Sequence, residues 1–250
     1  MHPILFKVGP LVIYTYGIFV TLGFLCGFSL FLQATRKKNL EEKKILSLSL
    51  WVVASGIIGA RIFYVLDQLY WYLEHPQDVL KIWQGGLVFY GGLLFSLAIG
   101  LYFIRHHGLP FWDIADISAP PLALGISIGR IGCFFNGCCY GKPWKWGLIF
   151  SPDSAAGRVF PNQPLFPTQL ISSANLLVIF FILIVLRSRQ SLSQHIFLWF
   201  LVLYSVHRFM IEFIRADYPK VLFHLTVPQF ISIILGISSL MLMSGKRRHD

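Results

Sequence analysis

The chain has 250 residues, of which only 13% are charged and 56% are hydrophobic, and its formal net charge is +10. Soluble domains have about 25% charged residues, so this composition excludes an ordinary soluble protein and predicts one that crosses a membrane several times. Lysine and arginine gather in cytoplasmic loops and near anionic headgroups of membrane lipids, which explains the positive charge. No pattern typical of RNA or DNA binding occurs, so no nucleic-acid partner is expected.

Seven stretches are predicted to be transmembrane helices, because a spanning helix needs about 20 mostly apolar residues. In chain order they cover residues 11–33, 46–70, 86–104, 114–134, 168–187, 194–214 and 226–244. The first is followed by Arg36-Lys37-Lys38 without a small-residue cleavage site, so we expect it to stay as an anchor. No internal repeat is found. The prediction is an all-α polytopic membrane protein with residues 1–250 as one integral domain.

The loops between these stretches differ in positive charge. Eleven lysine and arginine residues lie in the loops and tail on one side of the predicted membrane and seven on the other. The positive-inside rule places the eleven in the cytoplasm. The N-terminus is therefore predicted to be periplasmic and the C-terminus cytoplasmic.

Two segments on the outer side are more aromatic than ordinary loops. Residues 70–85 include Trp71 and Trp83, and the connection over residues 141–167 includes Trp144 and five prolines. Tryptophan and tyrosine favour the headgroup layer, and a loop of about 25 residues is usually functional or disordered. We predict an interfacial periplasmic arm over the first segment and a small cap over the second.

The fourth predicted span ends in Gly129-Arg-Ile-Gly-Cys-Phe-Phe-Asn-Gly-Cys-Cys-Tyr-Gly141. Arg130 is costly in a membrane segment, so we expect it to bind an anion or to close an ion pair. Asn136 is a second polar candidate in this stretch. Its glycines, Gly141 among them, allow the backbone to turn tightly and to approach a ligand closely.

A second polar row lies between Tyr204 and Arg215. Arg208 and Glu212 are four residues apart and Arg215 follows three later, so the three lie on one helical face and can pair. In lipid this face must point into the helix bundle. The row is either purely structural, or one arginine is neutralised by Glu212 while another binds a phosphate with two hydrogen bonds. His207 points elsewhere and is assigned no function.

Arg61 and Tyr90 are the polar candidates of two other spans. Arg61 either forms a structural ion pair, with Asp67 or Glu212, or takes part in binding substrate. Tyr90 is either a core tyrosine or lies beside exposed backbone, because paired glycines flank it on both sides. The glycines after it that are candidates for substrate contact are Gly91 and Gly92.

Cys133, Cys138 and Cys139 follow the spacing Cys-x4-Cys-Cys. No histidine pair and no fourth sulfur ligand is close in sequence, so the pattern disfavours a zinc site. A disulfide would form if the stretch reached the oxidising outer side, and free packed thiols are the simplest expectation. No metal and no organic cofactor is predicted.

These motifs, in this order, resemble the bacterial prolipoprotein diacylglyceryl transferase family over nearly the whole chain. The signature of that family has the form Gly-Arg-x-Gly-Asn-Phe-x-Asn-x-Glu-x-x-Gly, and it is matched here at Gly129, Arg130, Gly132, Phe134, Asn136 and Gly141. Two positions depart from it. Cys133 stands in place of asparagine and Cys138 in place of glutamate, and both family residues are regarded as important for activity.

The resemblance implies a defined reaction in the bacterial inner membrane. The diacylglyceryl group of phosphatidylglycerol is transferred to the lipobox cysteine of a preprolipoprotein, a thioether forms, and glycerol 1-phosphate is released. The residues that it implicates are Arg130 and Arg208 at the leaving phosphate, Arg61 and Arg215 behind them or as a gate, Asn136 and Tyr204 at the headgroup, and Glu212 or Tyr90 near the proton of the thiol.

Two alternatives belong to other functional classes. The two cysteine departures are compatible with a divergent paralogue that binds or transfers another lipid. A seven-span transporter would use the intramembrane arginines as a substrate path, but the repeated halves that many transporters show are missing from the sequence. Turnover on a lipobox peptide separates the enzyme from the paralogue, and flux into sealed vesicles identifies a transporter.

Overall fold

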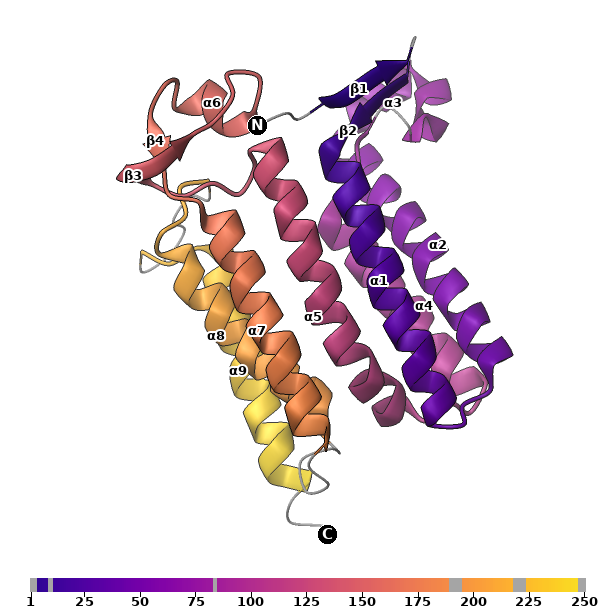
Figure 1. The fold of residues 1–250 in the computed structure, drawn as a ribbon. Coiled ribbons are helices and arrows are strands. Elements are labelled where there is room, and N and C mark those ends of the chain that lie inside the picture. The colour runs from indigo at the N-terminus through magenta and orange to yellow at the C-terminus, as the bar shows by residue number, and fades with distance from the viewer. Residues whose placement is uncertain (1–3, 9–10, 83–84, 189–194, 218–223, 247–250) are drawn as a thin grey trace. The chain divides into compact units, whose positions relative to one another are not determined.

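A computed structural model describes residues 4–8, 11–82, 85–188, 195–217 and 224–246 (Figure 1). The helices are α1 (Thr15–Lys37), α2 (Glu42–Asp67), α3 (Leu69–Glu74), α4 (Phe89–His106), α5 (Phe111–Asn136), α6 (Ala155–Val159), α7 (Thr168–Ser188), α8 (Ile196–Glu212) and α9 (Val227–Lys246), with a 3-10 helix η1 (Pro76–Leu80). The strands are β1 (Ile4–Val8), β2 (Leu11–Tyr14), β3 (Pro143–Ile149) and β4 (Pro164–Leu165).

Among the described helices, α1, α2, α4, α5, α7 and α9 are the six that are long and apolar enough to cross a membrane. The remaining predicted span corresponds to α8, which has 17 residues and lies at the short end of the usual range. The prediction of an all-α multi-pass membrane protein is therefore confirmed.

The start of the first predicted span is wrong. Residues Leu11–Tyr14 form β2, which pairs antiparallel with β1, and α1 begins only at Thr15. Val12, Ile13 and Tyr14 explain the difference, because β-branched and aromatic side chains favour extended backbone even where their hydropathy suits a helix.

The chain forms two compact units, and each is described by itself. Residues 34–114 form one unit, in which α2 packs closely along α4. A Cβ atom on Gly59 would lie 2.7 Å from the carbonyl oxygen of Gly91, and one on Gly91 would lie 2.5 Å from the carbonyl oxygen of Gly59. Only glycine at both positions allows this approach, which is the way small residues join helices in membranes.

We expect Gly59→Ala to destabilise this unit, because its methyl group would push α2 and α4 apart or strain their backbones. A loss of about 1–3 kcal/mol in the free energy of unfolding is typical of overpacking. Thermal unfolding of the purified protein in detergent measures it. Gly17→Ala is the matched control, since a Cβ atom there has nothing within 4 Å. Equal unfolding temperatures for the two variants would contradict the expectation.

Residues 1–33 and 115–250 form the other unit. A Cβ atom on Gly23 of α1 would lie 2.6 Å from the carbonyl oxygen of Gly125, so α1 and α5 also meet at glycines. Between α5 and α7, the hydroxyl groups of Ser127 and Ser173 each donate to the carbonyl oxygen of the other residue, at 2.8 and 2.9 Å. The apolar core of this unit is built from Ala119, Ala123, Leu176, Ile179, Leu183, Ile196 and Phe200.

The segment predicted as a cap is an ordered substructure. Strands β3 and β4 pair antiparallel, and α6 follows the N-cap residue Ser154, whose hydroxyl oxygen accepts a hydrogen bond from the backbone N–H of Gly157 at 3.1 Å. Its own small core is formed by Tyr140, Phe150, Ala156 and Leu165. The cap therefore offers a fixed surface where α5 ends and α7 begins.

Candidate active site

Helix α5 ends in a Schellman motif. The N–H of Cys138 donates to the carbonyl oxygen of Cys133, and the N–H of Gly137 donates to that of Phe134, both at 3.2 Å. Gly137 has a φ of 70°, and a Cβ atom there would lie 2.6 Å from the Cβ atom of Ser154, so only glycine fits. The motif folds the chain back so that Cys138 lies beside the last full turn of α5.

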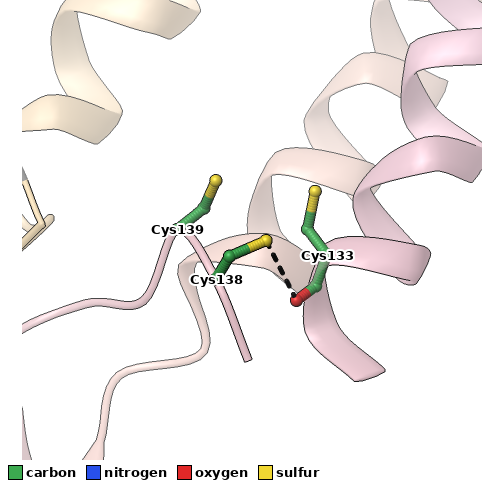
Figure 2. Close-up of side chains that lie close together, drawn as sticks. All are labelled: Cys133, Cys138 and Cys139. Carbon is green, nitrogen blue, oxygen red and sulfur yellow. Dashed lines mark hydrogen bonds between the residues drawn. The ribbon is translucent and has the colours of Figure 1, made fainter. Parts of the chain in front are cut away.

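Three thiols meet at this helix end. The sulfur atoms of Cys133, Cys138 and Cys139 all lie within 4.8 Å of one another (Figure 2). The thiol of Cys138 donates to the carbonyl oxygen of Cys133 at 3.7 Å, and no disulfide joins the three. Cys139 has a φ of 59°, which is uncommon for a residue with a side chain.

The start of α7 holds the turn that carries two of these cysteines. The hydroxyl of Thr168 donates to the carbonyl oxygen of Cys139 at 2.6 Å, and the amide nitrogen of Gln169 donates to that of Cys138 at 2.8 Å. Both side chains are buried. Neither residue was among the site residues predicted from the sequence, although polar groups in the first turn of an apolar helix were a visible signal.

Arg130 lies two turns before the end of α5, next to the thiols. Its Nη1 atom is 3.5 Å from the sulfur of Cys139 and donates to it. The positive charge of Arg130 also interacts with the charges of Arg208 and Arg215. The structure thus brings the two polar stretches singled out in the sequence into one site.

Glu212 is the centre of the arginine row. Its side chain is 0% exposed, and one of its carboxylate oxygens lies 2.8 Å from Nη1 of Arg208 and 3.7 Å from Nε of Arg215. The other oxygen accepts a hydrogen bond from the hydroxyl of Thr226 at 3.0 Å. The predicted pairing of Arg208 with Glu212 on one face of α8 is therefore confirmed, Arg215 pairs from beyond the end of the helix, and Thr226 joins the row to the start of α9.

Arg215 lies just beyond α8 and is held on two sides. It donates to both carboxylate oxygens of Asp217, at 2.9 and 2.6 Å. Burial is the largest single influence on the pKa of Arg215 and lowers it, but the hydrogen bonds with Asp217 and the nearby negative charges together raise the pKa above its usual value. Its backbone forms a bridge with Gly141, which fastens the segment after α8 to the turn after α5.

The electrostatics of this site favour anions. The thiols of Cys133 and Cys138, followed by the positive charges of Arg215 and Arg130, lower the pKa of Cys139. A lower pKa increases the share of thiolate, the form that acts as a nucleophile and binds metals. The same cations suit a phosphate group of a lipid.

Seven of the predicted site residues belong to the unit that contains the thiols: Arg130, Asn136, Gly141, Tyr204, Arg208, Glu212 and Arg215. The other four, Arg61, Tyr90, Gly91 and Gly92, belong to the second unit. Tyr90 is exposed there and its ring lies edge-on to that of Phe89. The glycines pack against α2, and Gly141 packs against the carbonyl oxygen of Phe166, so each has a packing reason to be glycine.

Arg61 organises the arm. Its guanidinium donates to five carbonyl oxygens, those of Asp78 (2.6 Å), Val79 (2.8 Å), Gly85 (2.8 Å), Gly86 (3.1 Å) and Lys81 (3.5 Å). The rings of Tyr64 and Tyr72 have their centroids 5.6 and 5.4 Å from its central carbon. Among the described residues, its hydrogen bonds go to this backbone rather than to Asp67, and Glu212 is paired with Arg208.

We expect Arg61→Met to loosen the arm, because the carbonyl oxygens would lose a common donor, and hydrogen bonds to charged groups contribute about 1.5–3 kcal/mol. Limited proteolysis in detergent should then cut residues 75–88 several times faster than in the parent protein. Arg105→Met at the exposed end of α4 is the control. Unchanged cleavage in Arg61→Met would show that the arm is held by other contacts.

The sequence is similar to those of one known protein family. The sequence model of the family described as prolipoprotein diacylglyceryl transferase matches residues 3–244. A protein of Bacillus velezensis named phosphatidylglycerol–prolipoprotein diacylglyceryl transferase is 34% identical over 251 residues, which cover 99% of this chain and 93% of that protein. Proteins of the same name from Geobacillus kaustophilus and a Nostoc species are 35% and 32% identical, and they cover 96% and 98% of this chain with 90% of their own length.

Proposed function

Because the chain belongs to the prolipoprotein diacylglyceryl transferase family, we propose that it transfers the diacylglyceryl group of phosphatidylglycerol to the cysteine thiol of a prolipoprotein. The observation that carries the proposal is that buried Glu212 pairs with Arg208 and Arg215 while Arg130 lies within electrostatic range of both arginines, at positions that match the family motifs. The bacterial inner membrane is the proposed location, and residues 1–250 act as one transferase domain.

The reaction breaks one bond and forms another at the same carbon. The thiolate sulfur attacks the glyceryl carbon that carries the phosphate, and the carbon–oxygen bond breaks with its electron pair on the phosphate oxygen. The products are a thioether and glycerol 1-phosphate. Arg130 and Arg208 stabilise the negative charge that develops on the leaving phosphate, because they are positioned before the reaction begins.

The other predicted residues support this step. Glu212 already neutralises part of the charge on two guanidinium groups, so its main role is to position Arg208 and Arg215. Asn136, at the end of α5, and Tyr204, on α8, supply hydrogen bonds to the headgroup. Arg61 and Tyr90 remain residues that the resemblance implicates, and within its own unit Arg61 orders the arm.

A transfer assay tests the proposal. The purified protein in nanodiscs is mixed with phosphatidylglycerol and a lipobox peptide, and mass spectrometry detects a diacylglyceryl thioether. A peptide with serine in place of the cysteine should give no product. Absence of product with the cysteine peptide, while a known family member is active alongside, would contradict the proposal and favour a paralogue that uses another lipid.

A further inference from the structure

The thiol cluster is the one group of chemically active side chains in this site that the reaction above does not use. We propose that Cys133, Cys138 and Cys139 bind one thiophilic metal ion of the Zn²⁺ type, and that its open coordination position takes the thiol of the acceptor peptide. The second half of this proposal rests on the proposed function, whereas the first half does not.

The distances suit a single ion. Zinc–sulfur bonds of about 2.3 Å in a tetrahedral site place two sulfur ligands about 3.8 Å apart. The three sulfur atoms here already lie within 4.8 Å of one another. Small rotations about the Cα–Cβ bonds, within the ordinary spread of a rotamer, bring them together, and their backbone need not move. The backbone is fixed by the Schellman motif at Gly137 and by the hydrogen bonds from Thr168 and Gln169.

The charges suit a thiolate-bound ion. Three thiolates and one divalent cation carry a net charge of about −1, and thiolates are the form that coordinates zinc. Arg130 donates to the sulfur of Cys139 at 3.5 Å, and the charge of Arg215 also acts on that thiol. A hydrogen bond from outside the coordination shell is a common way to orient and tune a metal ligand.

The cluster supplies three ligands, one fewer than a closed structural zinc site needs. Among the described histidine, cysteine, aspartate and glutamate residues, these three form a group of possible ligands without a fourth member. Structural zinc sites are usually closed by four protein ligands, whereas catalytic sites use three and leave one position for water or substrate. Arg130, one of the arginines proposed to hold the lipid phosphate, donates to one of the three sulfur ligands at 3.5 Å.

The open position supplies what the proposed reaction needs. A free cysteine thiol has a pKa of about 8.5 and is mostly protonated at neutral pH. Coordination to the ion deprotonates the acceptor thiol and releases the proton to water. The bound thiolate then attacks the glyceryl carbon, and the carbon–oxygen bond electrons leave on the phosphate oxygen. The resulting thioether is neutral, so it binds the ion more weakly than a thiolate and departs.

The proposed metal site gives a single explanation for both departures from the family signature. Cys133 and Cys138 stand where the signature has asparagine and glutamate, and Cys139 adds a third sulfur beside them. Exchanging an amide and a carboxylate for thiols would only remove hydrogen-bonding groups if the positions acted singly. As a set they form a soft-metal site in the same place.

Cobalt titration tests the metal site without any turnover. Co²⁺ is added anaerobically to the full-length protein in detergent, with a reductant that contains no thiol. One ion should bind per chain and give sulfur-to-cobalt charge-transfer absorption. Cys133→Ser, Cys138→Ser and Cys139→Ser should each weaken binding by more than about 100-fold, since outer-shell changes alone cost roughly 10–100-fold. Cys26→Ser, which removes the fourth cysteine, is the matched control and should bind normally.

The same experiment separates the two halves of the proposal. Adding the lipobox peptide should change the cobalt d–d absorption, whereas the serine peptide should not, even if no transfer follows. Wild-type protein that binds no Co²⁺ or Zn²⁺, or that holds two of the three thiols in a disulfide after non-reducing purification, would overturn the metal site. If cobalt bound tightly but its d–d absorption did not change when the lipobox peptide was added, the claim that the acceptor thiol binds the ion would be overturned. The transfer assay tests the proposed function independently.

Discussion

Arg130→Ala is expected to lower the rate of diacylglyceryl transfer by roughly 10³-fold, because a preorganised donor to a developing anion contributes about 10²–10³-fold in rate. Arg130 lies 3.5 Å from the sulfur of Cys139 and shares its electrostatic environment with Arg208 and Arg215. Arg130→Lys should recover only part of the loss, since an ammonium group cannot bind a phosphate with two parallel hydrogen bonds. Mass spectrometry of the peptide product measures the rates.

The control for this experiment is Arg187→Ala, at the cytoplasmic end predicted for α7. It removes the same side chain from a membrane helix far along the sequence from the site, and it should leave transfer unchanged. Unfolding temperatures are compared so that a loss of activity is not a loss of fold. A rate within about threefold of the parent protein for Arg130→Ala would contradict the phosphate role, because the expected effect is roughly 10³-fold.

The second large effect is expected in stability. Glu212→Ala leaves Arg208 and Arg215, whose side chains are 12% and 4% exposed, without the carboxylate between them. Removing one partner of a buried ion pair typically costs about 3–5 kcal/mol, because a buried charge loses its counter-charge. Arg215 keeps its ion pair with Asp217, so the loss falls mainly on Arg208. The contact from Thr226 at the start of α9 would be lost as well. Thermal unfolding in detergent measures the change.

A double variant shows whether charge is the cause. Arg208→Met combined with Glu212→Met removes both charges of the closest pair and replaces them with apolar groups, which is often nearly neutral for a buried pair. It should therefore be more stable than Glu212→Ala alone. If Glu212→Ala had the same unfolding temperature as the parent protein, the carboxylate would not stabilise the site. Its proposed role in positioning Arg208 would then be contradicted as well.

Sequence alone predicted the membrane architecture well, for a physical reason. A spanning helix must be apolar over about 20 residues whatever its neighbours do, so hydropathy finds it. The pairing of Arg208 with Glu212 was predictable too, because helical periodicity places residues four apart on one face. The start of the first span was missed because Leu11–Tyr14 are apolar but extended, and hydropathy does not distinguish the two.

Two parts of the site depended on contacts that residue types do not specify. For Arg61 the sequence left an ion pair with a carboxylate and a role in substrate binding open, whereas in the structure carbonyl oxygens of the arm accept its hydrogen bonds, and any backbone segment can offer those. The meeting of the three thiols depends on the turn at Gly137. Its signal was present in the sequence, since an Asn-Gly pair at a helix end predicts a Schellman motif, which brings Cys138 back to Cys133.

The glycine contact between α2 and α4 also sets an order of biogenesis. All residues of that contact lie within positions 34–114, so this helical pair can assemble in the membrane while the ribosome is still translating the rest of the chain. Helix α1 is synthesised first but meets α5 through Gly23 and Gly125, about one hundred positions later. Helix α1 can therefore meet this partner only after α5 has been synthesised.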